Sequence, residues 1–469
     1  MNKEGFAKMW DSDVKRNVLI VLLSFLGLIL LTYEYGVIAS YKYYAPGTVI
    51  NNKYVGLKSI DYADQALYEN PSEYTLKMKF RDQDYLISGY DIDLNYSYRE
   101  DLENIKNGQS PFMWPMYLSA PDHKIKKKIT FDRNKLVEYI DSFESMQSKN
   151  MKKPKNPTIE LNDDGVVVAV PQDPGSVIED KKEVYKAAVN AVNSEEKELD
   201  IDKAGLYKIS RYTVDSAKVK QCVDRCNRIV GLGVKYYYGD TELELEPYQL
   251  FGTIKISDKY DMIISRQRVQ EMLESFSRLH DTYSSIRKFK NHNHKYISIT
   301  NSDYGWEMDI ENETDALYKD MIHHKSVSRE PAMLHTGFTY NKKGDDIGGT
   351  YAEVSLDEQM MFFYKDNRLV LSTEVVTGNI NLGRSTPPGI YNVDYHQTPA
   401  TLKGEDYETK VTYWMPFNGG IGFHDATWRG IFGGDIYTYD GSHGCVNMPY
   451  SSAEELFFEI EDGTPVIVY

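Results

Sequence analysis

The segment Ser442-His443-Gly444-Cys445-Val446-Asn447 carries the densest chemistry in this chain, and Phe423-His424-Asp425 lies a short distance upstream of it. The segment holds one of only three cysteines, next to a glycine and two residues from a histidine. A free thiol, with a pKa of about 8.5, is a poor nucleophile at neutral pH unless a nearby base or positive charge produces the thiolate. Two histidines near one cysteine, beside a glycine that permits close backbone approach, supply such activation. The pattern indicates an enzyme that transfers acyl groups through Cys445.

Length and composition restrict the remaining possibilities. A chain of 469 residues is too long for one ordinary core, because a domain averages roughly 150 residues. The formal net charge of -16 argues against nucleic acid as a partner, since phosphate binding requires a basic face. Cysteine use fits an exported protein without a disulfide framework. Cys222 and Cys226 lie four residues apart in a helical pattern, so we expect them to share a helix face as structural residues.

The N-terminal segment 18–39 is expected to cross a membrane once, as a signal-anchor that follows a cytoplasmic stretch of residues 1–17. Residues 18–33 carry no charge, and the tyrosine-flanked stretch after them completes a span of the hydrocarbon layer. Lys15 and Arg16 favour an inside N-terminus, with the rest of the chain outside the cell membrane at the cell wall. A cleaved signal peptide is the alternative, although no persuasive small-x-small cleavage site precedes the tyrosines.

The middle of the chain predicts two α+β modules of similar plan. Residues 136–146 and 269–279 carry apolar residues at the same helical spacing, so each predicts a helix with one buried stripe. A strand-patterned stretch precedes each helix, and an extended run with a turn and a further helix follow. The expected limits of the modules are residues 50–205 and 206–330. Residues 329–349, which contain a proline and several glycines, are expected to be a linker.

Residues 349–469 change to a strand pattern and predict a mostly β domain. Four ordered motifs in it, namely VVTGN, Thr386-Pro387-Pro388-Gly389-Ile390-Tyr391, His424 and SHGCVN, resemble the YkuD-type catalytic domain of L,D-transpeptidases. The resemblance implies a β-sandwich or barrel fold here. The two modules and the anchor are similar to the peptidoglycan-binding repeats of Gram-positive members. The expected fold class is therefore multidomain, with a transmembrane helix, two α+β modules and a C-terminal mostly β domain.

The resemblance implies a peptidoglycan cross-linker that acts on stem peptides and glycan strands without a cofactor. In that reaction, Cys445 attacks the carbonyl of the third residue of a donor tetrapeptide and expels the terminal D-alanine. The side-chain amine of the third residue of an acceptor stem then resolves the thioester, which gives a 3→3 cross-link. The family assignment makes His424 the base. His443 orients Cys445, binds substrate or shares the role of the base.

Further candidate residues surround these three. The backbone amides of His443, Gly444 and Cys445 are the expected oxyanion donors. Asp425 either holds an imidazole in the required tautomer, as the third member of a triad does, or caps a loop. Ser442 and Asn447 are expected to bind substrate, and Asn447 stands where many family members have arginine. The aromatic residues expected to line the substrate cleft, with core packing as the other interpretation, are Tyr413, Trp414, Met415 and Trp428.

Several competing interpretations remain. Zinc binding is disfavoured, because His443-x-Cys445 is tighter than the common ligand spacings, and no metal is expected. A sortase requires an arginine after its cysteine, and residues 446–469 contain none. An L,D-carboxypeptidase that uses water as the acceptor and a non-catalytic wall-binding or scaffold protein stay open. Four further histidines, which resemble a site in the sequence, are expected to be solvated loop and helix-end residues; they are His292, His294, His323 and His324.

Overall fold

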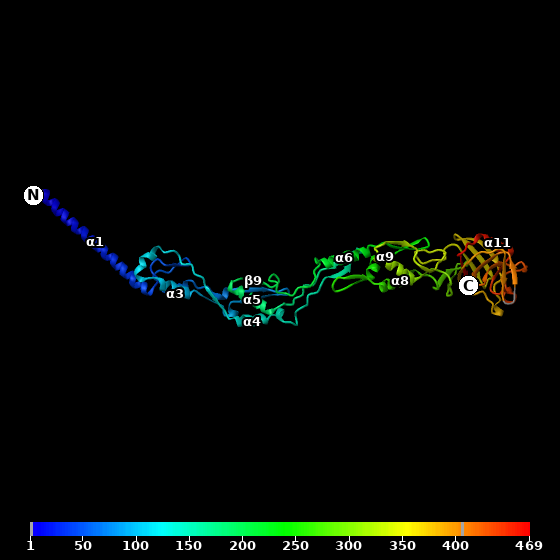
Figure 1. Cartoon of the computed structure of the whole chain (residues 1–469), viewed down its shortest axis with the longest axis horizontal. Helices are drawn as coiled ribbons and strands as arrows, with labels where there is room; N and C mark the ends of the chain where they lie inside the picture. The colour runs from blue at the N-terminus through cyan, green and yellow to red at the C-terminus, as the bar shows by residue number, and fades with distance from the viewer. Residues whose placement is uncertain (1–2, 405–407) are drawn as a thin grey trace. The chain divides into compact units, whose positions relative to one another are not determined.

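The computed structural model describes residues 3–404 and 408–469, and its elements are labelled in Figure 1. The chain forms two compact units. The first runs to Asn156 and resumes over Gln172–Arg211, and the second consists of Pro157–Pro171 and Tyr212–Tyr469. Each unit is described by itself below.

Helix α1, Lys3–Lys42, opens the first unit and is the long blue helix of Figure 1. Within the described part of the chain, its segment Asp13–Lys42 is the one helix long and apolar enough to cross a membrane. Near its end the helix has one covered face, on which Gly36, Val37 and Ser40 are buried. That face packs against the 3-10 helix η3, Pro111–Ser119.

A small lobe surrounds the end of α1. Its core contains Tyr44, Ile50, Val55 and Leu102, all fully buried. The elements of this lobe besides η3 are β1 (Val49–Ile50), β2 (Lys53–Tyr54), α2 (Ile60–Ala66) and α3 (Arg99–Gly108).

The rest of the first unit is an α+β module built on a three-stranded sheet of order β4-β3-β9. Strands β3 and β4 form an antiparallel hairpin, and β9 pairs with β3 in parallel. Asp132 and Asp180 start the two main helices, since each carboxylate accepts backbone amides of the first turn. The elements are η1 (Pro71–Glu73), β3 (Thr75–Lys79), β4 (Asp84–Ser88), η2 (Tyr90–Ile92), β5 (Asn95–Ser97), β6 (Lys128–Thr130), α4 (Arg133–Asp141), η4 (Glu144–Met146), α5 (Lys181–Asn193) and β9 (Glu198–Asp200).

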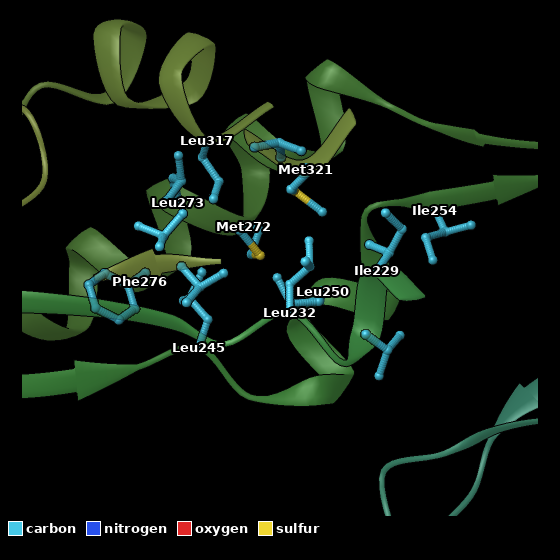
Figure 2. Packing of buried hydrophobic residues seen from close by; sticks show 14 of the residues in the cluster. Ile229, Leu232, Leu245, Leu250, Ile254, Met272, Leu273, Phe276, Leu317 and Met321 are labelled. Atoms are coloured by element: carbon cyan, nitrogen blue, oxygen red, sulfur yellow. The ribbon is translucent and has the colours of Figure 1, made fainter. Parts of the chain in front are cut away.

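The second unit begins with a module whose sheet has the order β11-β10-β17, again a hairpin plus one parallel strand. Figure 2 shows its core, in which Leu273 and Phe276 of α8 lie near Leu317 of α9. The elements are α6 (Ala217–Val230), β10 (Val234–Tyr238), β11 (Thr241–Glu244), α7 (Pro247–Gly252), β12 (Ile254–Ile256), β13 (Met262–Ile264), α8 (Arg266–His280), β16 (Glu307–Met308), α9 (Ile310–Ile322), β17 (Val327–Arg329) and β18 (Met333–His335).

Two hairpins connect neighbouring parts of the chain. The hairpin of β7 (Thr158–Leu161) and β8 (Val167–Val170) falls inside the expected limits 50–205, but the structure places it in the second unit. There the side chain of Asn227 exchanges two 2.8 Å hydrogen bonds with the backbone of Val167. The hairpin of β14 (Arg287–Lys290) and β15 (Tyr296–Ile299) likewise packs into the last domain. Module limits that follow the order of the sequence therefore assign both hairpins to the wrong part of the structure.

The expected linker at residues 329–349 is instead structured. Strand β18 pairs with β16, and Tyr340 is buried in the core of the second module. Asp346 is 1% exposed and forms a 2.8 Å ion pair with Arg287. Glycines and a proline indicated a linker, but the long-range partners of this segment hold it in place.

His292 is likewise not the solvated loop residue that the sequence predicts. Its Nδ1 lies 2.8 Å from a carboxylate oxygen of Glu353, and its Nε2 lies 2.8 Å from one of Glu358. The ring stacks on Phe362 with centroids 4.1 Å apart. All three partners belong to the last domain, so the hairpin β14–β15 is bonded to it as well as packed against it.

The last domain is mostly β, as its pattern predicts. A five-stranded sheet of order β21-β20-β19-β28-β22 and a three-stranded sheet of order β25-β26-β27 share one core, to which Phe363, Phe423 and Val446 belong. The elements are β19 (Tyr351–Ser355), β20 (Met360–Lys365), β21 (Arg368–Glu374), η5 (Ile380–Leu382), β22 (Gly389–Asn392), β23 (Ala400–Lys403), β24 (Glu408–Val411), β25 (Trp414–Asn418), β26 (Ile421–Asp425), α10 (Ile436–Tyr439), β27 (Val446–Met448), α11 (Tyr450–Glu459) and β28 (Pro465–Val468).

Candidate active site

The three-stranded sheet places the main candidate residues in one row. Trp414 of β25 lies opposite His424 of β26, and His424 lies beside Asn447 of β27. Side chains of directly paired residues point to the same face of a sheet, and neighbours along a strand point to opposite faces. The sheet thus buries Phe423 in the core and presents His424 on its other face. Cys445, two residues before Asn447, packs against Trp414 on this second face.

A pocket of about 260 Å³ opens over this face. Its lining brings together six of the residues that the sequence predicts, drawn from two separate stretches of chain. They are His424, Trp428, Ser442, His443, Cys445 and Asn447.

His424 is held as a neutral base. It is 3% exposed, and its Nδ1 lies 2.9 Å from the backbone oxygen of Asp425. Because that oxygen only accepts, Nδ1 carries the proton and Nε2 keeps its lone pair. Burial lowers the pKa of His424, against the opposing effect of Asp425, and the charge of Arg429 lowers it further. The imidazole therefore stays unprotonated at neutral pH and is able to take up a proton.

Cys445 is held as a thiol. It is 6% exposed, and its Sγ lies 3.5 Å from the backbone oxygen of Gly420, to which the thiol donates. Burial raises the pKa of Cys445 to about 11, although a hydrogen bond from the amide of Gly422 opposes the rise. At neutral pH the sulfur therefore carries its proton, and nucleophilic attack requires a base to remove it.

Hydrogen bonds fix the loop that carries Cys445. The hydroxyl of Ser442 donates to the backbone oxygen of Cys445 at 2.5 Å and accepts from the amide of Gly444 at 3.0 Å. Thr386 Oγ1 donates to the backbone oxygen of Gly444 at 2.7 Å. Gly444 has φ +123°, where a side chain is strained. Ser442 thus shapes the loop from the inside, and the Gly444 amide, one of three expected oxyanion donors, is already bonded.

Asp425 points away from the imidazole. Its carboxylate oxygen accepts the backbone amides of Thr412 and Tyr413 at 2.7 and 2.8 Å. Of the two interpretations of Asp425, this geometry favours the loop-capping one. It is the backbone oxygen of Asp425, and not its carboxylate, that accepts a hydrogen bond from His424 and orients the imidazole.

His443 is exposed at the mouth of the pocket. Its Nε2 contacts Nη1 of Arg384, and since a guanidinium only donates, Nε2 accepts in that contact. The lone pair that a base would need is occupied there. The arrangement favours a role of His443 in orienting the loop or contacting substrate.

The aromatic candidates separate into two groups. Trp428 is 52% exposed and lines the pocket, with its ring 5.9 Å from that of His424. Trp414 is buried, with its ring 6.0 Å from that of His424. Tyr413 and Met415 belong to the core between the sheets, where Tyr413 donates to Glu454 at 2.7 Å. For these two the core-packing interpretation holds, because neighbours on a strand alternate between faces.

Arg429 and Asp440, which sequence reasoning missed, also line the pocket. Arg429 donates to Asp440 at 2.7 Å, and its side chain is 9% exposed whereas that of Asp440 is 71% exposed. Among the described residues, the buried Nε of Arg429 and Oδ1 of Asn447 have no hydrogen-bond partner. The position of Arg429, five residues after His424, was the only available signal in the sequence.

The donor set does not suggest a metal centre. Within residues 3–404 and 408–469, no group of three or more histidine, cysteine, aspartate or glutamate side chains lies close enough to hold an ion.

Two segments of the chain match models of known protein families. Residues 349–468 match the model of the L,D-transpeptidase catalytic domain, YkuD, and residues 88–200 match a peptidoglycan binding domain. No match was found among curated proteins.

Several solved structures are similar to this chain. A crystal structure of Enterococcus faecium L,D-transpeptidase, a cysteine-to-serine mutant, is 30% identical and covers 53% of this chain and 100% of that chain, with a TM-score of 0.46. The catalytic domain from E. faecium, solved by NMR, is 42% identical over 27% of this chain and 100% of that chain, with a TM-score of 0.25. An L,D-transpeptidase from Mycobacterium tuberculosis is 20% identical over 26% of this chain and 57% of that chain, with a TM-score of 0.23. Residues 349–468 match the catalytic-domain model, and the chain is 30% identical to the E. faecium L,D-transpeptidase over the full length of that structure. The chain therefore belongs to the L,D-transpeptidase family.

Proposed function

We propose that this protein forms 3→3 cross-links in peptidoglycan through a thioester at Cys445. The observation that carries the proposal is the pairing of a buried thiol and a buried neutral imidazole in one pocket, Cys445 and His424. Neither group is sufficient alone, because the thiol keeps its proton at neutral pH and the imidazole is a base without a nucleophile to activate. Together they supply a nucleophile and its base.

The first half of the reaction is an acylation. His424 Nε2 takes the proton of the Cys445 thiol, and the sulfur attacks the carbonyl carbon of the third residue of a donor tetrapeptide. A tetrahedral oxyanion forms, for which backbone amides of the loop are the donors. On collapse, the carbon–nitrogen bond breaks, His424 returns the proton to the leaving amine, and D-alanine departs.

The second half repeats these steps with an acceptor. The side-chain amine of a second stem attacks the thioester carbon, His424 removes a proton from that amine, and the carbon–sulfur bond breaks. The proton returns to the sulfur and restores Cys445. Water in place of the amine makes the same protein an L,D-carboxypeptidase, and loss of both steps leaves a wall-binding protein.

Intact mass spectrometry of the full chain with a disaccharide-tetrapeptide tests this function. We expect a covalent adduct whose mass corresponds to loss of D-alanine, together with 3→3 dimers in solution. Tripeptide without dimers at saturating acceptor contradicts the transpeptidase and indicates the carboxypeptidase. Binding without an adduct or product contradicts both and indicates a wall-binding protein.

Arg429 is proposed to recognise the carboxylate of the donor stem. Its guanidinium lines the pocket with a buried Nε that has no hydrogen-bond partner, and Asp440, which accepts from its Nη1, is 71% exposed and therefore able to move aside. A charge-assisted hydrogen bond is worth about 1.5–3 kcal/mol, so Arg429→Gln is expected to raise KM for the tetrapeptide roughly 10- to 100-fold. Steady-state kinetics measure this change.

The matched control for this prediction is Arg368→Gln, an exposed arginine on β21. It is expected to leave KM unchanged. A fall in kcat with unchanged KM for Arg429→Gln would show that Arg429 acts on His424 through its charge and not on the donor.

A further inference from the structure

The 3-10 helix η3 presents an uncharged apolar surface to the outside. Residues 107–121 contain no charged side chain. Within η3, Phe112, Met113, Met116 and Leu118 are between 48% and 64% exposed. Soluble proteins rarely expose large contiguous apolar patches, and those that do use them to contact a partner or a membrane.

The 3-10 helix η3 packs directly against helix α1. The hydroxyl of Tyr33 donates to the backbone oxygen of Phe112 at 2.9 Å, and the indole of Trp114 donates to the backbone oxygen of Tyr33 at 3.0 Å. A side chain at Gly36 would overlap that indole, so the close approach depends on glycine. The contact is therefore specific, and it joins two exposed apolar surfaces into one.

Further contacts at Gln109, just before η3, and at Tyr117 and Leu118 hold η3 against the rest of the small lobe. The buried amide of Gln109 accepts from the backbone of Ala45 and donates to Thr48, both at 2.8 Å. Gly47 lies so close to the backbone at Tyr117 and Leu118 that a side chain there would overlap it. Because these contacts hold the backbone of η3 in place, the exposure of its apolar side chains is not a result of loose packing.

The level of η3 along α1 matches the boundary of a membrane. The uncharged run covers residues 18–33, Glu34 follows it, and Gly36 lies eighteen residues after Val18, which is about 27 Å at the rise of an α-helix. The hydrocarbon core of a bilayer is roughly 30 Å thick. A bilayer that holds α1 therefore ends along the turn from Tyr33 to Gly36, where the carboxylate of Glu34 reaches the headgroups and Trp114 packs. Tryptophan and tyrosine are enriched at such interfaces.

We propose that residues 111–119 form a second membrane contact, which rests in the interfacial layer of the outer leaflet beside the exit of α1. The occupant of this surface is lipid, because η3 is uncharged and continuous with an apolar helix of spanning length. The proposal rests on α1 being a membrane anchor. A helix alone is able to tilt and rotate, whereas a helix plus a rigid side contact fixes the orientation of the first unit on the membrane.

Site-specific fluorescence on the full chain tests the proposal. Single cysteines at Met113→Cys and Met116→Cys are labelled with an NBD fluorophore in a Cys445→Ala background, since Cys222 and Cys226 are buried. The protein is reconstituted into phosphatidylcholine–phosphatidylglycerol vesicles. We expect a blue-shifted emission at both sites, and stronger quenching by doxyl groups near the headgroup than by deep ones.

Two further labels serve as references in the same vesicles. Tyr90→Cys, at a residue 81% exposed in the same unit, is expected to report water, and Leu26→Cys in α1 is expected to be quenched by deep doxyl groups. If sites 113 and 116 behave like site 90 while site 26 is quenched, the second contact is wrong and the anchor stands. If site 26 also reports water, the anchor itself is wrong and the proposal fails with it.

Discussion

Cys445→Ala is expected to give no acyl-enzyme and no cross-linked product when the full chain is incubated with a disaccharide-tetrapeptide. The physical reason is that the pocket then lacks the sulfur that accepts the acyl group, and neither histidine in it is placed to replace it. Loss of a nucleophile that acts as a unit with its base lowers the rate by roughly 10⁴-fold or more in other enzymes. Intact mass spectrometry measures the missing adduct, and chromatography of the products measures the missing dimer.

The fold is expected to survive this change. Cys445 packs in a small cluster with Ala400, Val411 and Trp414, apart from the main core of the domain, so loss of one sulfur atom removes little buried area. Cys222→Ala is the matched control, because Cys222 is also buried but lies on α6 of the second module. That control is expected to keep full activity. Turnover that persists in Cys445→Ala, or that disappears in Cys222→Ala, would refute the proposed thioester.

Local patterns predicted much of the fold. Helical spacing at residues 269–279 gives α8, and the pattern around Cys222 and Cys226 gives α6. Strand patterns predicted the mostly β character of the last domain. These features depend on side chains close in sequence, so a single sequence contains enough information to find them.

Features that depend on distant partners were not predictable in the same way. His292 has an ordinary loop sequence around it, and its carboxylate partners Glu353 and Glu358 follow some sixty residues later. The hairpin at 157–171 belongs to the second unit because of its packing, although the chain enters and leaves it from the first. Hydropathy and turn signals carry no information about such pairings.

The candidate site shows the same division. The ordered histidine and cysteine motifs were sufficient to predict that His424 and Cys445 act together, and both residues line one pocket. The sequence left two roles open for Asp425, and the choice depends on whether the amides of Thr412 and Tyr413 reach its carboxylate. Arg429 was missed because a lone arginine has no spacing pattern, and only burial beside the pocket makes it a candidate.

His424→Ala is expected to slow acylation by about 10²- to 10⁴-fold at neutral pH, since it removes the general base. The change in pH dependence is more diagnostic. In the parent protein, the lowered pKa of His424 means that the base is lost only as the pH falls below the ordinary histidine range, so the rate stays level through neutrality. In the variant, attack requires thiolate formed without help, and the rate is expected to rise with pH toward the Cys445 pKa of about 11. Acylation measured by quenched-flow mass spectrometry from pH 5 to 10, a range over which the thiolate fraction of the variant changes roughly 10⁵-fold, records both profiles.

His443→Ala is the matched variant for this measurement, because it removes the other histidine of the same pocket. Since Nε2 of His443 accepts from Arg384, we expect this variant to keep the acid limb of the parent and to lose activity only through weaker loop or substrate contacts. If His443→Ala instead produces the steep rise toward high pH while His424→Ala keeps the level profile, the two histidines exchange roles. If both variants keep the parent profile, neither histidine removes the proton, and the buried thiol must be activated by the bound substrate itself.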